Sequence, residues 1–186
     1  MRKTLVAAAA VLVLALAACG QPGGPGGSGG SSTSNASSLA GSTSEIMTTL
    51  LADVAAALPK DTAPITEQVP LTADLAPQIG LTAAQFTDLV TEGTLSRAMI
   101  MTFAHEVVLI KAKDAASATQ LKAAIAEKYD PTKWICVFPE QASVVESGAY
   151  VLVAVSTKQY VTAALDAFTK AAGTTGTVNT FYTGAA

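Results

Sequence analysis

The sequence predicts an α+β domain, because a strand, a turn, a second strand and a helix occur twice in succession in its second half. Shifting the first unit by 44 residues, with no gap, lays Val107 on Val151 and Leu121 on Leu165. Two such units predict a four-stranded antiparallel sheet with helices packed on one face, preceded by N-terminal helices. We expect this domain to cover residues 45–172 and to be followed by a loose tail over residues 173–186.

Three segments are expected before the repeated units, and a helix and an extended segment come first. Ser42 and Glu45 have the spacing of a capping box, which predicts a helix over residues 43–58. Pro59 ends this helix, because proline cannot supply the backbone N–H that helix continuation requires. A short extended segment is expected over residues 65–71.

A second capping box, Thr82 with Gln85, predicts a short helix that stops near residue 92. The two repeated units follow this helix. Their expected elements are strands 98–102 and 106–111, helix 115–128, strands 143–146 and 149–155, and a helix that reaches residue 172. Asp114 and Ser156 are the expected N-caps of the two helices.

The first residues have the pattern of a bacterial export signal. Arg2 and Lys3 precede an apolar run over residues 5–18, which is shorter than the roughly 20 residues that a membrane-spanning helix needs. The run closes with Leu-Ala-Ala before Cys19, which resembles the lipobox of bacterial lipoproteins. We therefore expect residues 1–18 to be a cleaved signal peptide and Cys19 to carry the lipid anchor.

Residues 19–44 hold this cysteine and a stretch rich in glycine, serine and proline, which predicts a flexible tether. Without residues 1–18 the chain keeps nine basic and 14 acidic residues, a formal charge of −5. This charge argues against nucleic acid as a partner and against electrostatic binding to anionic lipid. The expected location is the extracytoplasmic face of the cell membrane. The expected partners are the membrane, through Cys19, and an envelope protein.

Few residues in the domain suggest chemistry. Cys136 is the only other cysteine and His105 the only histidine. The apolar neighbours of Cys136 favour a buried thiol, and His105 is expected to be a polar turn residue. No Cys/His cluster has the spacing of metal ligands, and no nucleophile elbow or phosphate-binding loop is present. The sequence therefore predicts no metal, no cofactor and no catalytic residue.

The linker between the two units is unusually apolar. It contains the only tryptophan of the chain, and its aromatic residues Tyr129, Trp134 and Phe138 form a candidate binding patch. Such a linker either packs under the sheet or offers a binding surface. In the second case Trp134 is the expected centre of the surface.

Two strand segments carry a family resemblance. The stretches AHEVVLIKAKD at residues 104–114 and GAYVLV at residues 148–153 resemble the Gram-positive lipoprotein family catalogued as domain of unknown function, family number 4358. The resemblance covers about residues 50–172 and implies a lipobox, a polar tether and paired strand–helix units. It implies no catalytic residue. Residues 130–140 depart from the helix that the family pattern would continue there.

These patterns predict a membrane-anchored, non-catalytic binding or accessory domain. One alternative is a cell-envelope enzyme that uses His105 or Cys136, which requires one of them to line a cleft with a perturbed pKa. Another is a small solute-binding lipoprotein. About 140 residues beyond the tether are few for two lobes and a cleft, so this alternative ranks last.

Overall fold

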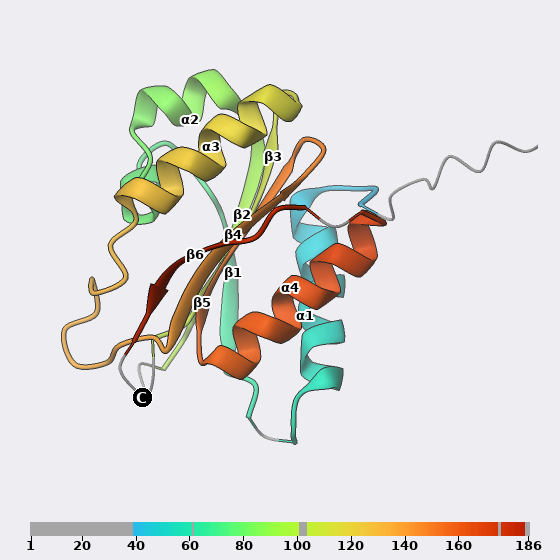
Figure 1. Cartoon of the computed structure of the whole chain (residues 1–186), viewed down its shortest axis with the longest axis vertical. Coiled ribbons are helices and arrows are strands. Elements are labelled where there is room, and N and C mark those ends of the chain that lie inside the picture. The colour runs from blue at the N-terminus through green and yellow to red at the C-terminus, as the bar shows by residue number, and fades with distance from the viewer. Residues whose placement is uncertain (1–38, 61, 101–103, 175, 185–186) are drawn as a thin grey trace, which may run out of the picture. The chain divides into compact units, whose positions relative to one another are not determined.

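The computed structural model describes residues 39–60, 62–100, 104–174 and 176–184 (Figure 1). The signal peptide, Cys19 and most of the predicted tether lie outside the described residues. Within those residues the chain forms one six-stranded sheet, four α-helices and a short 3-10 helix. The α+β class and the antiparallel sheet are therefore confirmed.

The sheet has two more strands than predicted. Its members are β1 (Thr66–Pro70), β2 (Val90–Ala98), β3 (Glu106–Ala112), β4 (Gln141–Ser147), β5 (Tyr150–Ser156) and β6 (Asn179–Thr183). They are ordered β1-β2-β3-β5-β4-β6, and every neighbouring pair is antiparallel. The prediction of four strands was wrong because both ends of the sheet are extended by strands from outside the repeated units.

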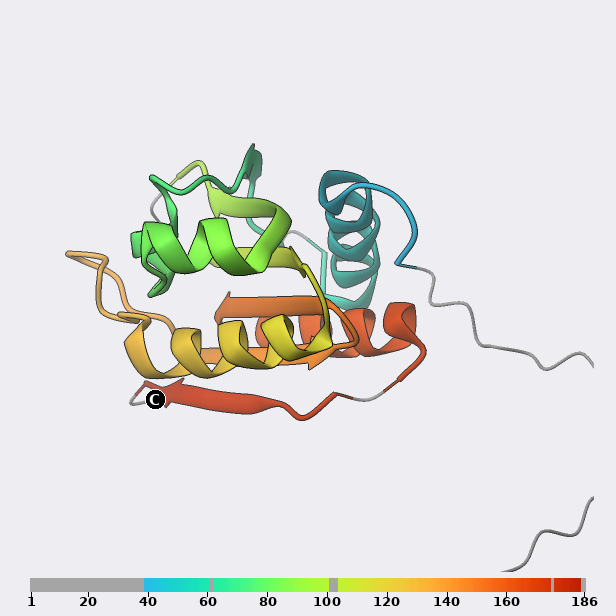
Figure 2. The same cartoon turned by 90° about the horizontal axis from the view of Figure 1, so that it is seen from above.

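The outer strand β6 lies in the segment predicted to be a loose tail (Figure 2). It pairs with β4 and gives the polar backbone of that strand hydrogen-bond partners. Thr180 bonds Ser143 through their hydroxyls at 2.9 Å, and the ring of Phe181 lies 5.5 Å from that of Tyr129. These contacts join segments far apart in the sequence, so no local sequence pattern predicted β6.

Strand β2 starts earlier than predicted. It occupies residues where the sequence suggested a helix end and a turn, and it stops at Ala98, where a strand was expected to begin. Residues 101 and 102 of the expected strand lie outside the described part of the chain. The polar Thr94 and Ser96 are buried, and Thr94 bonds Thr43 of the first helix through their hydroxyls at 2.8 Å. Because polar residues occupy buried positions in β2, its sequence lacks the alternation of apolar and polar residues that predicts a strand.

Helices cover both faces of the sheet, so the expectation of one covered face was wrong (Figure 1). Helices α1 (Thr43–Ala57) and α4 (Lys158–Ala172) lie on one face. The other face carries η1 (Ala76–Ile79), α2 (Ala83–Leu89) and α3 (Ala115–Lys128).

The topology explains this arrangement. The connections β3-α3-β4 and β5-α4-β6 each pass over one strand, and both step in the same direction across the sheet. Because β3 and β5 are antiparallel, two crossovers of the same hand place their helices on opposite faces.

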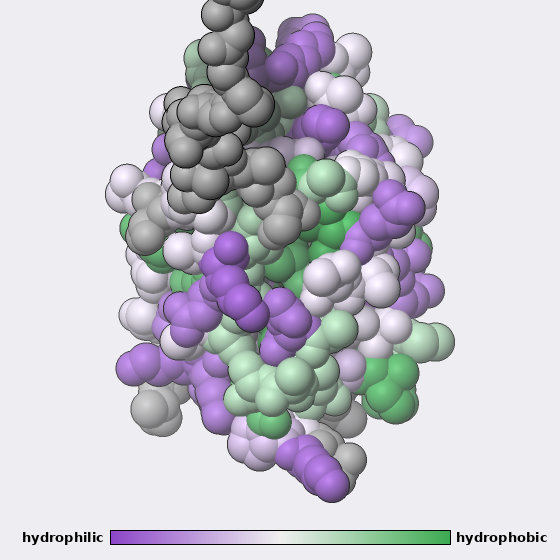
Figure 3. Space-filling model, turned by 90° about the vertical axis from the view of Figure 1, so that its right-hand side faces the viewer, coloured by the Kyte–Doolittle hydropathy of each residue, from purple (hydrophilic) through white to green (hydrophobic). Residues whose placement is uncertain are grey.

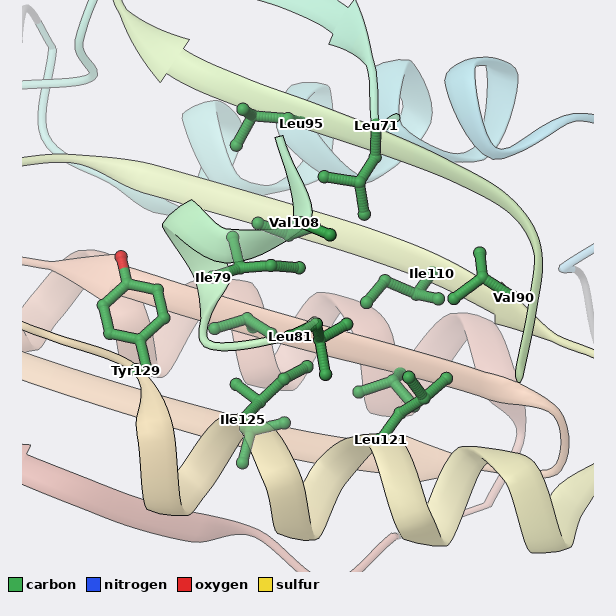
Figure 4. Close-up of a cluster of buried hydrophobic side chains, with 14 of the residues drawn as sticks. Leu71, Ile79, Leu81, Val90, Leu95, Val108, Ile110, Leu121, Ile125 and Tyr129 are labelled. Carbon is green, nitrogen blue, oxygen red and sulfur yellow. The ribbon is translucent and has the colours of Figure 1, made fainter. Parts of the chain in front are cut away.

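Two hydrophobic cores result, one on each face. In β3, Val108 and Ile110 contribute to the core under α3, which Figure 4 shows, whereas Val107 and Leu109 contribute to the core under α1 and α4. Consecutive apolar residues of this kind are typical of strands buried on both sides.

The helix starts agree closely with their sequence signals. Ser42 and Thr82 both form the predicted capping boxes, and Asp114 caps α3. The N-cap of α4 is Thr157 and not the expected Ser156, since the hydroxyl of Thr157 accepts the backbone N–H of Tyr160.

Candidate functional site

Three connecting segments meet at one end of the sheet. Strand pairing aligns Thr66 with Ala98, Glu106 with Val155, and Gln141 with both Ser156 and Thr183. The residues before β1, those after β2 and the linker between α3 and β4 therefore lie beyond the same end of the sheet, the lower end in Figure 1.

This end carries five large apolar side chains that are exposed to solvent. Their exposed fractions range from 58% for Ile100 to 92% for Ile135. We call this set the tip. Its residues are Ile65, Met99, Ile100, Ile135 and Phe138.

A buried carboxylate holds the linker that contributes to the tip. The ammonium of Lys133 donates to both oxygens of Glu106 at 2.9 Å, and the hydroxyl of Tyr129 donates to Oε1 of Glu106, also at 2.9 Å. The side chains of Glu106 and Lys133 are 5% and 21% exposed. Burial and the neighbouring carboxylate raise the pKa of Tyr129 well above its ordinary value, so the phenol stays protonated and donates.

Lys133 also connects the linker to its other neighbours. Its ammonium donates to the backbone carbonyl of Gln78 at 2.8 Å. It lies 4.5 Å from the ring centre of Tyr129 and 4.9 Å from that of Trp134, within cation–π range of both. Glu106, Lys133 and Tyr129 thus use one another as partners, and the cluster fixes the inner half of the linker against the sheet.

A pocket of about 370 Å³ opens beside this cluster. It is lined by Gln78, Arg97, Ala98, His105, Glu106, Lys133 and Trp134. The imidazole of His105 is buried, with Nδ1 3.1 Å from the hydroxyl of Ser156 and the ring packed edge-on to Tyr160 at 4.5 Å. Burial lowers the pKa of His105 to about 4, so the ring is neutral at neutral pH. His105 directly precedes a strand, as expected, but it is a buried residue because that strand is covered on both faces.

The structure separates the three residues of the predicted patch. Tyr129 is buried in the core, Trp134 is half-buried against it, and Phe138 is 60% exposed. The linker therefore does both things that its composition allowed: Tyr129 and Trp134 pack against the core, and Phe138 is exposed.

Cys136 is exposed, so the prediction of a buried thiol was wrong. The indole of Trp134 takes the inward position, and the following residues Ile135 and Cys136 face solvent. An apolar neighbourhood in the sequence does not bury a thiol when the apolar neighbours are themselves exposed.

Sequence reasoning missed Lys133 and most of the tip. Met99 and Ile100 were assigned to a strand, whereas β2 ends at Ala98 and leaves them exposed. The sequence signal for Ile135 is the apolar run around Trp134. Consecutive residues of a linker that packs on one side cannot all be buried, so part of this run had to be exposed.

A second hollow follows the seam between α1 and α4, where two adjoining pockets of about 230 and 560 Å³ share Asp53 and Lys170. Figure 3 views this side and shows apolar surface in the hollow between polar residues. Among the described residues no group of three or more His, Cys, Asp and Glu side chains could hold a metal ion. In the same part of the chain no helix is both long enough and apolar enough to span a membrane.

No protein-family model matches the chain, and no curated protein or solved structure matches it either. The resemblance to the Gram-positive lipoprotein family therefore stays a prediction.

Proposed function

We propose that the chain is a lipid-anchored protein of the extracytoplasmic membrane face, and that its domain is a non-catalytic binding module whose contact surface is the tip. The observation that carries the proposal is the gathering of five large exposed apolar side chains at one end of the sheet. Several large apolar residues exposed at one end of a domain are unusual, because isolated exposed apolar residues need no explanation whereas larger apolar surfaces mark interaction sites.

The described part of the chain begins away from this surface. The carbonyl of Leu39, the first described residue, accepts the hydroxyl of Tyr150 at 3.0 Å. Tyr150 begins β5, so the chain reaches the domain at the end of the sheet opposite the tip. An anchor on Cys19 would thus be connected to the domain at the end away from the tip.

The polar residues near the tip support binding rather than catalysis. The carboxylate of Glu106 already accepts from Lys133 and Tyr129, and Lys133 already donates to two acceptors. Groups that satisfy one another in this way position a segment of chain and are poor candidates for moving protons to a substrate. The neutral, buried His105 agrees with this interpretation.

The test places a photo-cross-linking amino acid at position 135 or, as control, at position 178. Val178 is also an exposed apolar residue, but it precedes the end of β6 that lies away from the tip. In intact cells we expect a reproducible adduct, to lipid or to protein, from position 135 only. Equal adducts from both positions would contradict the proposal. Cys19→Ala should release the chain from the membrane fraction, and retention there would contradict the anchor.

A further inference from the structure

The geometry points to a lipid bilayer as the surface that the tip contacts: Ile65, Met99, Ile100, Ile135 and Phe138 insert at the polar–apolar boundary of the membrane that holds the Cys19 anchor. This inference rests on the proposed function, because it takes the anchor on Cys19 and the tip as the contact surface.

The shape of the tip suits a fluid partner. The five side chains come from three separate segments, and Ile135 is 92% exposed. A protein partner offers such residues a fitted pocket, because binding hot spots are closely packed on both sides. A bilayer needs no such fit, since apolar side chains are buried at its interface in proportion to their area.

Two cations beside the tip are paired with carboxylates of the domain. Arg97 bonds Glu67 at 2.7 Å, and Lys133 bonds Glu106 at 2.9 Å. At these two positions contact with a bilayer strips water from neutral pairs and not from isolated ions, which would cost far more. The exposed carboxylates of Asp130 and Glu140 lie in the same linker, so they have to stay on the water side of the contact. The chain without residues 1–18 has a formal charge of −5, so we expect insertion to depend on apolar area and not on attraction to anionic lipid.

The length of chain before the domain is sufficient for this contact. Residues 20–38 separate Cys19 from Leu39, and 19 residues can span at most about 65 Å. The seven residues of β5 run about 25 Å from the Leu39 end of the sheet to the tip. The domain can therefore turn so that its tip reaches the membrane of its own anchor. Tethering also raises the effective concentration of membrane at the tip, so a weak insertion is enough.

The single tryptophan of the chain provides a built-in reporter, because Trp134 is half-buried and adjoins Ile135. The test uses the processed lipoprotein, purified from membranes and reconstituted in phosphatidylcholine vesicles with brominated acyl chains. We expect the Trp134 emission to shift to the blue and to be quenched by the brominated lipid. The quenching should persist at molar salt, where the Debye length is only about 3 Å.

Substitutions connect the signal to the tip. Ile135→Ser with Phe138→Ser should abolish most of the quenching, whereas Val178→Ser, at the other end of β6, should leave it unchanged. Unquenched Trp134 emission in the unsubstituted protein overturns the inference without relying on any variant.

The two proposals fail in different ways. If position 135 cross-links a protein in cells but Trp134 is not quenched in protein-free vesicles, the partner is a protein and only the membrane inference is wrong. If position 135 gives no more adduct than position 178, the proposed function itself is wrong.

Discussion

The ammonium of Lys133 lies 2.9 Å from each carboxylate oxygen of Glu106, although the two residues are 27 positions apart. This contact divides the linker before β4 into two parts. Tyr129 and Trp134 pack against the core, whereas Ile135, Cys136 and Phe138 are presented to solvent before Pro139 is buried again. Both proposals depend on this arrangement, in which the Glu106–Lys133 contact fixes the linker that carries the exposed apolar side chains.

Removing the carboxylate charge should destabilise the domain. Glu106→Gln leaves Lys133 as a largely buried cation with weaker acceptors, and we expect a loss of about 3 kcal/mol in the free energy of unfolding. Glu127→Gln is the matched control, because Glu127 pairs with Lys128 at the surface, and its loss should stay below about 0.5 kcal/mol. Urea denaturation measures both. Equal losses would mean that the Glu106 pair is no more than a surface contact.

Gly80 should not tolerate a side chain. Its φ is +81°, and an added Cβ would lie 2.6 Å from the backbone nitrogen of Tyr129. Gly80→Ala is expected to cost more than about 2 kcal/mol in unfolding free energy. Gly148 also has a positive φ, of +55°, but no atom lies within 4 Å of its Cβ position, so Gly148→Ala should cost only about 1 kcal/mol. Similar thermal midpoints for the two variants would contradict this prediction.

Acid should destabilise the domain through His105. Its pKa falls to about 4 on folding, so between this value and its ordinary value the unfolded chain binds the proton more readily. The stabilisation is complete above about pH 6.5 and is lost as the pH falls towards 4, by about 3 kcal/mol over this range. His105→Gln removes the titrating group and should flatten the dependence. Urea midpoints at several pH values measure the slope, and equal slopes for both proteins would refute the assignment.

Two phenylalanines should respond very differently to truncation. Phe168 of α4 is fully buried, so Phe168→Ala should reduce the free energy of unfolding by about 4 kcal/mol. Phe138 is in the exposed tip, and Phe138→Ala should change the free energy of unfolding by less than about 1 kcal/mol. Calorimetric midpoints distinguish the two cases. A large loss on truncating Phe138 would show that the tip is part of the core.

Cys136 should react with a thiol reagent in the folded protein. Its side chain is exposed, so modification needs no unfolding. The measurement uses a chain that carries Cys19→Ser, so that one thiol remains, and compares the labelling rate in buffer with that in denaturant. Cys136→Ser provides the blank. Labelling that appears only in denaturant would place the thiol inside the fold.

Local signals in the sequence predicted local structure well. The capping boxes at Ser42 and Thr82 need only residues three positions apart, and both are formed. The apolar strands β3 and β5 were found for the same reason, since a run of apolar residues is enough to identify a buried strand.

Features that depend on distant partners could not be found in this way. Thr94 is buried, and its hydroxyl shares a hydrogen bond with that of Thr43, 51 positions earlier. The position of β6 depends on its pairing with the edge of β4 that faces away from β5. In the candidate site Tyr129 and Trp134 were recognised by their residue type, whereas Lys133 gained its role only through its contact with Glu106. The consecutive apolar residues of β3 indicated a strand that is buried on both faces. The predicted four-stranded sheet had helices on one face only, so it did not account for this pattern.

The sharing of β3 between two cores has a consequence for how the domain opens. Val107 and Val108 are neighbours in the chain and both have partners in the ladder that β3 forms with β2, yet their side chains belong to different cores. Any fluctuation that breaks this ladder disturbs the packing on both faces at once. The amides of β3 and β5 should therefore exchange hydrogen with solvent only when the whole domain unfolds, whereas those of the outer strands β1 and β6 should exchange through smaller openings.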